Sequence, residues 1–395
     1  MRHSALSSRP PAANSYAVAT PIETIDELTL PTSVATSAVR PRPRLDWMDC
    51  LRGLAIVLVI IVHAYSIALS DSHGGRLPWI GHFNGLVGPL RMPAMMFLSG
   101  LLVPRSLLKG TATYVDGKVR RILYPYFLWS ALMITFFYIA TVTIGWGYSA
   151  DLWFRPFYAP LEHLWFLANL FLYFIIARVV VRLNPLIASA AFFGVSFFPI
   201  AGQWHTFWYF AGFFMLGVGA ARLPALWSAL TGKIWLSAAL LLASLAVFFT
   251  FDTGGMGAVG EAVRIPSAIA GLVGAAGLTM RVASVRFLRP IRFIGRNSIV
   301  FYLAHWPLII FSSRVLAQEH DFGVRKLFVA SLVAALVGSF ALTILATRFA
   351  VVNLLFVWPT SSAARPVAKP ASSPSGKLVV NEPAVPVARA PIPPG

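Results

Sequence analysis

The chain is poor in cysteine and in acidic residues, with one cysteine and 14 Asp and Glu among 395 residues. A single thiol cannot form an intramolecular disulfide or a thiolate metal cluster, which excludes both. The acidic residues fall outside the long apolar runs, so no predicted membrane span holds a carboxylate that could carry a proton. Charged residues make up only 12% of the chain and hydrophobic residues 57%, a composition unlike that of soluble domains.

The hydrophobic residues are collected in runs of about 17 to 22 residues, the length that crosses a bilayer as a helix. The runs lie near residues 54–70, 86–104, 123–144, 163–181, 186–202, 207–221, 234–251, 265–280, 296–313 and 327–350. We therefore expect an all-α fold, a polytopic integral membrane helical bundle with about ten transmembrane helices. The runs at 186–202 and 207–221 are short and close together, so they could instead form one broken or re-entrant element.

The 32 basic residues give a net charge of +18, but they lie at the ends of the apolar runs. This distribution indicates a lipid bilayer as the partner and no nucleic acid. Basic residues such as Arg105, Arg121 and Arg182 gather in every second loop, and acidic residues such as Asp151 and Glu261 lie in the others. The alternation predicts an even number of helices with both termini in the cytoplasm.

Both ends of the chain have low sequence complexity. Residues 1–44 are rich in Ala, Ser, Thr and Pro, and residues 358–395 in Pro, Ala and Val. We expect two disordered cytoplasmic tails around a transmembrane domain at 45–357. The first 45 residues lack an apolar core long enough for a cleavable signal peptide, so the first helix is expected to act as an uncleaved signal anchor.

The most informative stretch is LDWMDCLRGLAIVLVIIVH, residues 45–63, which places a histidine inside the first predicted span. Polar side chains are costly in a membrane span and are usually retained for function. His63 follows Arg52 by eleven positions, so on an α-helix the two share one face about 16 Å apart. The alternative is that His63 is a hydrogen-bonded packing residue.

Two further segments place positive charge near the membrane. Arg91 enters the second predicted helix from the outer side, where it could hold an anionic or hydroxyl-rich ligand near His63 or snorkel to the interface. The loop GKVRRILYP brings together Lys118, Arg120 and Arg121. Such a loop is a ready phosphate clamp, although binding of anionic lipid would explain the same residues.

Two aromatic segments also carry polar groups. EHLWFL places His163 at the outer interface beside Trp165, where an aromatic belt is the ordinary explanation of the tryptophan. FIGRNSIVFYLAHWPLII carries a polar stripe made of Asn297, Ser298, Tyr302 and His305. Helical spacing puts Ser298, Tyr302 and His305 on one face, which should point into the bundle as hydrogen-bonding contacts between helices or as part of a catalytic site. No histidine shows a clear metal-ligand spacing, so we expect no metal site.

These motifs resemble the membrane-bound acyltransferase-3 family, which acylates sugars and surface glycans in bacteria. The resemblance covers roughly residues 45–350. Its most specific element is the arginine, ten residues, histidine pattern of Arg52 and His63, and MPAMMFLSG, RRILYP, HLWFL and IGRNSIVFYLAHWPL follow in the family's order. The RMP and HLWFL versions look closer to the sugar O-acetylase and glucan succinyltransferase-like branch. One departure is Lys118, which stands where the family pattern has an arginine, so phosphate binding survives without bidentate geometry.

The resemblance implies transfer of an acyl group from cytoplasmic acyl-CoA, with acetyl-CoA as the expected co-substrate, to a hydroxyl of a sugar or cell-surface glycan. His63 would act as general base or accept the acyl group itself. Arg52 would organise the donor and be oriented by Asp49, while Lys118, Arg120 and Arg121 would bind CoA phosphates. The expected substrate-binding residues are Arg91, His163, Trp165, Asn297, Ser298, Tyr302 and His305. We expect a multi-pass protein of the bacterial inner membrane with no permanently bound cofactor.

Two other classes of function fit part of this pattern. A transporter or flippase could use His63, Arg91 and His305 as a proton-coupled pathway, although the sequence shows no clear inverted repeat. A non-enzymatic scaffold would require His63→Ala to be harmless.

Overall fold

The described part of the chain is helical. The computed structural model describes residues 45–72, 74–145, 150–180, 182–198, 204–250, 260, 263–319 and 322–359, and these residues contain no strand. Residues from Leu45 onward belong to one compact unit. The predicted N-terminal tail, and the C-terminal tail beyond Pro359, lie outside the described residues.

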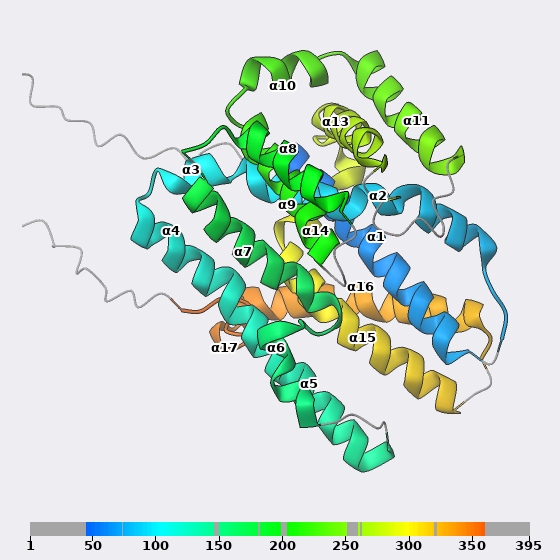
Figure 1. Cartoon of the computed structure of the whole chain (residues 1–395). Helices are drawn as coiled ribbons and strands as arrows, with labels where there is room; N and C mark the ends of the chain where they lie inside the picture. Colours follow the sequence, from blue (N-terminus) through cyan, green and yellow to red (C-terminus); the bar gives the residue numbers. More distant parts are fainter. Residues whose placement is uncertain are drawn as a thin grey trace, which may run out of the picture. The chain divides into compact units, whose positions relative to one another are not determined.

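Ten helices carry the apolar runs (Figure 1). They are α1 (Asp46–Asp71), α2 (Pro78–Leu101), α5 (Tyr124–Ile144), α7 (Trp165–Val180), α8 (Pro185–Ser196), α9 (Trp204–Ala220), α11 (Ile234–Thr250), α13 (Ile265–Val282), α15 (Ser298–Glu319) and α16 (Val324–Arg348). Each of them overlaps one of the predicted apolar runs.

Shorter helical segments connect the long helices. They are α3 (Val103–Leu107), α4 (Thr111–Lys118), a π-helical segment (Val119–Leu123), α6 (Arg155–Tyr158), α10 (Pro224–Thr231), α14 (Arg289–Arg296) and α17 (Ala350–Asn353). Three 3₁₀ turns span Ala150–Trp153, Glu162–Leu164 and Arg286–Leu288.

Within the described residues, seven helices are long and apolar enough to cross a membrane, and an eighth is obtained if α9 and α10, bent by 103°, count as one span. The helices α8 and α11 are apolar but shorter. With its 12 residues α8 is about 18 Å long, less than the thickness of the hydrocarbon core. The chain is a multi-pass membrane protein, and the expected all-helical bundle of about ten helices agrees with this architecture.

The closely spaced runs at 186–202 and 207–221 form two separate helices that pack against each other. Ser189 Oγ on α8 donates a hydrogen bond of 2.8 Å to the carbonyl of Gly212 on α9. A Cβ at Gly212 would lie 2.4 Å from the ring of Phe193, so only glycine permits this approach. The structure therefore favours the helix pair over a single broken element.

The first helix is the centre of the bundle around the site. It packs against α2, α13, α14, α15 and α16 (Figure 1). Arg52 on α1 and Ser298 on α15 line one cavity, and His63 meets His305 further along the same two helices. The helices α1 and α15 therefore run in the same direction, which brings two polar faces into register.

Candidate active site

The two intramembrane histidines of α1 and α15 are in direct contact. Nδ1 of His63 lies 3.0 Å from Nε2 of His305. The two rings are stacked, with their centroids 5.2 Å apart and their planes 6° from parallel. His305 is fully buried, whereas His63 is half-buried. The expected polar face of α15 therefore meets the polar face of α1.

The backbone of α15 decides which nitrogen of each ring carries the proton. Nδ1 of His305 lies 3.0 Å from the carbonyl oxygen of Phe301, which can only accept a hydrogen bond. Nδ1 of His305 must therefore donate, and in a neutral ring its Nε2 is then an acceptor. His63 consequently donates from Nδ1, and its Nε2 keeps a lone pair. An imidazole held in this tautomer can accept a proton or attack a carbonyl.

His163 packs against the same pair. Its ring centroid lies 5.1 Å from that of His305, and its ring stacks on Trp306 at 5.6 Å. The hydroxyl of Tyr302 donates to the backbone carbonyl of His163. Neither ring nitrogen of His163, nor Nε1 of Trp306, has a hydrogen-bonding partner among the described residues. The histidine pair therefore lies beside buried polar atoms that have no hydrogen-bonding partner among the described residues.

The position of His163 differs from the interface position expected from the sequence. The side chain is 3% exposed and lies among α15 residues. Glu162 has a backbone φ of 41°, the left-handed region that ordinary residues rarely adopt, and it precedes the start of α7. This turn directs His163 into the bundle. Trp165, one helical position beyond the turn, stacks instead on Phe210 of α9 at 5.3 Å.

A cationic cavity lies at the Arg52 end of α1. It has a volume of about 210 Å³ and contains three basic residues, Arg52, Lys118 and Arg121. Ser99, Ser298 and Tyr302 also line it, together with apolar residues of α2 and α7. None of its lining residues is acidic. We call this the Arg52 cavity; its charge suits an anionic ligand such as a phosphate.

Two residues that the sequence grouped with this cavity have other partners. Arg120 donates from Nε to both carboxylate oxygens of Asp116, at 2.7 and 2.8 Å, and from Nη1 to the carbonyl of Pro359 at 2.6 Å. It faces away from Lys118 and Arg121, which lie one helical turn apart. Asp49, expected to orient Arg52, accepts a hydrogen bond of 3.1 Å from Arg296.

A family model described as an acyltransferase domain matches residues 45–348. The match covers the helices that build the histidine pair and the Arg52 cavity. The chain belongs to the acyltransferase-3 family. The comparisons with curated proteins and with solved structures give no match. Membership makes the protein an acyltransferase, which favours an enzyme over the transporter and scaffold alternatives.

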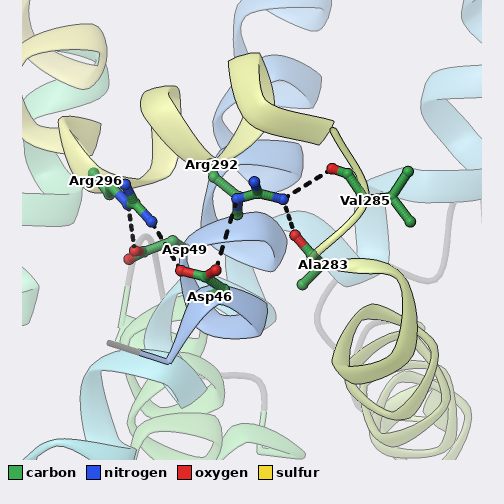
Figure 2. A network of polar contacts seen from close by, with 6 residues as sticks. All are labelled: Asp46, Asp49, Ala283, Val285, Arg292 and Arg296. Atoms are coloured by element: carbon green, nitrogen blue, oxygen red, sulfur yellow. Dashed lines mark hydrogen bonds and ion pairs between the residues drawn. The ribbon is translucent and has the colours of Figure 1, made fainter. Parts of the chain in front are cut away.

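The acyltransferase fixes the start of α1 with a network of charges on α14 (Figure 2). Arg296 binds Asp46 at 2.8 Å and Asp49 at 3.1 Å, and Arg292 lies 4.0 Å from Asp46. Arg292 also donates to the backbone carbonyls of Ala283 and Val285. The network joins α1 to α14 and to the loop before it, beside Arg52.

The backbones of α1 and α14 approach each other very closely in this region. A Cβ at Gly295 would lie 1.7 Å from the carbonyl oxygen of Asp49, and one at Gly53 would lie 2.0 Å from that of Ile291. Small residues at such crossings let membrane helices pack without an intervening side chain. Asn297 ends α14 and donates from its amide to the carbonyl of Phe293 at 2.9 Å, so it caps this helix rather than lining the Arg52 cavity.

A second cavity of the acyltransferase contains Arg91. Its volume is about 330 Å³, and its polar lining residues are Asn84, Arg91, Tyr209 and Arg264. Arg264 was not among the residues expected from the sequence. It directly precedes α13, and only the fold brings this position next to α2. We call this the Arg91 cavity.

Proposed function

We propose that the chain is an O-acyltransferase that moves an acetyl group from acetyl-CoA to a hydroxyl of a sugar or cell-surface glycan. The observation that carries the proposal is the hydrogen-bond chain from His63 through His305 to the carbonyl of Phe301. This chain leaves Nε2 of His63 unprotonated, as a general base or nucleophile requires.

The donor would bind in the Arg52 cavity through its phosphates. Arg52, Lys118 and Arg121 supply three positive charges there, and no lining residue opposes them. The distance along α1 from Arg52 to His63 is about 16 Å, so an extended phosphopantetheine arm is needed to bring the thioester to the histidine. Tyr302 lines the Arg52 cavity, and its ring centroid lies 5.9 Å from that of His305, so this one side chain links the cavity wall to the histidine pair.

Two reaction routes are open, and both use the lone pair on Nε2 of His63. Nε2 of His63 takes the proton of the acceptor hydroxyl while the hydroxyl oxygen attacks the thioester carbonyl carbon. The carbon–sulfur bond then breaks, and the CoA thiolate leaves and takes this proton from Nε2. Alternatively, Nε2 attacks the thioester carbonyl carbon, the carbon–sulfur bond breaks, and the CoA thiolate leaves. The acceptor hydroxyl oxygen then attacks the acyl carbon, the bond from that carbon to Nε2 breaks, and the hydroxyl proton passes through the freed Nε2 to the thiolate. His305 holds the required tautomer in both routes.

The charge distribution of the loops supports a location in the bacterial inner membrane with both termini in the cytoplasm. In this orientation the Arg52 cavity faces the cytoplasm, where acetyl-CoA is found. The acceptor then reaches His63 from the opposite side.

The test is transfer of radiolabelled acetyl groups from acetyl-CoA to envelope glycans in membranes that hold matched amounts of each variant. Wild type and the control His205→Ala should label the glycans, and His63→Ala should not. Equal labelling by His63→Ala would contradict the proposal. Without acceptor, label that stays on wild-type protein and is absent from His63→Ala identifies the acyl-imidazole route, and its absence from both identifies the general-base route.

A further inference from the structure

Measured along the helix axes, the Arg91 cavity lies at about the same level as His63 and away from the level of the Arg52 cavity. Ser99 on α2 and Arg52 on α1 line the Arg52 cavity together. Arg91 lies eight residues before Ser99, about 12 Å along α2, and His63 lies eleven residues after Arg52, about 16 Å along α1. The two helices are antiparallel neighbours, so Arg91 and His63 reach nearly the same level.

Two polar atoms of this cavity have no hydrogen-bonding partner among the described residues. Nη1 of Arg91 and Oδ1 of Asn84 are covered from solvent and have no hydrogen-bonding partner among the described residues. Leaving a covered charged donor unpaired is costly, so a group that pairs with it binds favourably. None of the described residues that line the cavity is acidic.

The cavity has room for more than a single small group. A neighbouring hollow of about 610 Å³ shares Gly85 and Arg264 with it and is lined by residues of α2 and by Phe248 and Phe249. Tyr209 and Phe210 contribute aromatic surface to the Arg91 cavity itself. Aromatic walls with a few polar groups are typical of ligand-binding clefts.

We infer that the Arg91 cavity binds an anionic acceptor, with the guanidinium of Arg91 pairing with a carboxylate or phosphate oxygen next to the acylated sugar. A guanidinium offers the fork of donors that matches either oxyanion. The inference rests on the proposed function, because it names the acceptor class for the same histidine. Pairing of Arg91 with this oxyanion makes the enzyme selective for acidic over neutral acceptors.

The test is binding of matched ligand pairs to the full-length chain in vesicles. One pair is an oligoglucuronate and its carboxyl-reduced, neutral counterpart. The other is a hexose carried on a polyprenyl phosphate and the same hexose on a polyprenyl ether. Wild type should bind the anionic member of at least one pair about tenfold more tightly or better, since charge-assisted pairs are the strong ones. The pair that shows the preference identifies the source of the oxyanion.

Arg91→Gln should remove this preference and leave binding of the neutral members unchanged, which also shows that the variant is folded. Arg91→Lys should keep part of it, and the control Arg105→Gln on the exposed surface of α3 should keep all of it. Equal binding of both members by wild type, or a preference that persists in Arg91→Gln, overturns the inference. Acetyl transfer is measured in a separate assay. If acetyl groups are transferred but binding shows no preference for anionic ligands, the inference of an anionic acceptor is refuted and the proposed function stands. If anionic ligands are preferred but no acetyl group is transferred from acetyl-CoA, the proposed donor is refuted and the inference about the Arg91 cavity stands.

Discussion

His63 and His305 lie 242 positions apart in the chain, yet their ring nitrogens are 3.0 Å apart in the structure. The contact sets the protonation pattern of both rings, because the Phe301 carbonyl accepts from the far side of His305. The first and the ninth long helix thus share one hydrogen-bond chain. In the proposed mechanism His305 is a positioning residue for His63.

The positioning role predicts different outcomes for two replacements of His305. His305→Leu removes the acceptor for Nδ1–H of His63 and should lower acetyl transfer about a hundredfold or more, since general-base catalysis is worth about 10²–10⁴-fold. His305→Gln keeps an oxygen acceptor and should retain much more activity. Steady-state rates with matched protein amounts test this. Equal rates for the two variants would show that His305 serves packing alone.

If the Arg52 cavity is the donor site as proposed, its lining predicts which basic residues affect KM for acetyl-CoA. Arg52→Gln and Lys118→Gln should each raise KM for acetyl-CoA about tenfold or more, because a hydrogen bond to a charged group contributes about 1.5–3 kcal/mol. Arg120→Gln should leave KM almost unchanged, since its guanidinium is bound to Asp116 and Pro359. A strong effect of Arg120→Gln on KM, with none from Lys118→Gln, would reverse the assignment.

The close crossing of α1 and α14 predicts a sharp glycine requirement. Gly295→Ala places a Cβ 1.7 Å from a backbone oxygen of α1, so the helices must separate. We expect it to destabilise the fold by about 2 kcal/mol or more, a typical cost of overpacking. Gly81→Ala on α2 meets no atom within 4 Å and serves as the control. Thermal unfolding in detergent should show a lowered midpoint for Gly295→Ala only.

The charge network on α14 predicts sensitivity to salt rather than to alkali. The hydrogen bond to Asp49 raises the pKa of Arg296 above its already high ordinary value. A raised pKa in the folded state gives stability that is present below the unfolded-state pKa and lost only as the pH rises through the folded-state pKa. The folded-state and unfolded-state pKa values of Arg296 both lie above the pH range that proteins tolerate. The contribution of Arg296 to stability should therefore stay constant from about pH 6 to pH 10.

Arg296→Met tests this network. The Arg296 side chain is 39% exposed, so its ion pair with Asp46 is screened by solvent. The variant should therefore lose only about 0–1 kcal/mol of stability. The loss should shrink further as salt is added. Arg105→Met is the control for removal of an exposed charge. A stability difference that grows between neutral and alkaline pH would rule out this account.

The helices could be predicted from sequence because apolar runs of membrane length have few other structures available. Positions 54–70, for example, fall within α1, and all but the last two positions of the run 327–350 fall within α16. The short apolar runs predicted the helix ends less well. For example, α8 ends at Ser196, before the predicted boundary at residue 202. Whether two short runs form one element or two depends on packing between them, here on the contact of Gly212 with Phe193.

The candidate site was predicted in part. Spacing along a helix placed Arg52 and His63 on one face and grouped Ser298, Tyr302 and His305, because these relations are local. The pair of Arg120 with Asp116 is also local, but the long-range partners of Asp49 and Arg120 could not be predicted, since Arg296 and Pro359 lie more than 200 positions away in the chain. The inward position of His163 depends on a single backbone turn at Glu162 that no pattern of residue types reveals.

The pairing of α1 with α15 also has a consequence for biosynthesis. A nascent chain that has reached the end of α14 already carries Arg52, Lys118, Arg121 and His63, but it lacks the acceptor that fixes the His63 ring. It also lacks Ser298 and Tyr302 of α15, so the Arg52 cavity is still incomplete. On the proposed mechanism, the donor cavity and the His63 ring are completed only when the ninth long helix inserts beside the first, so the ribosome must deliver nearly the whole domain before acyl transfer can begin.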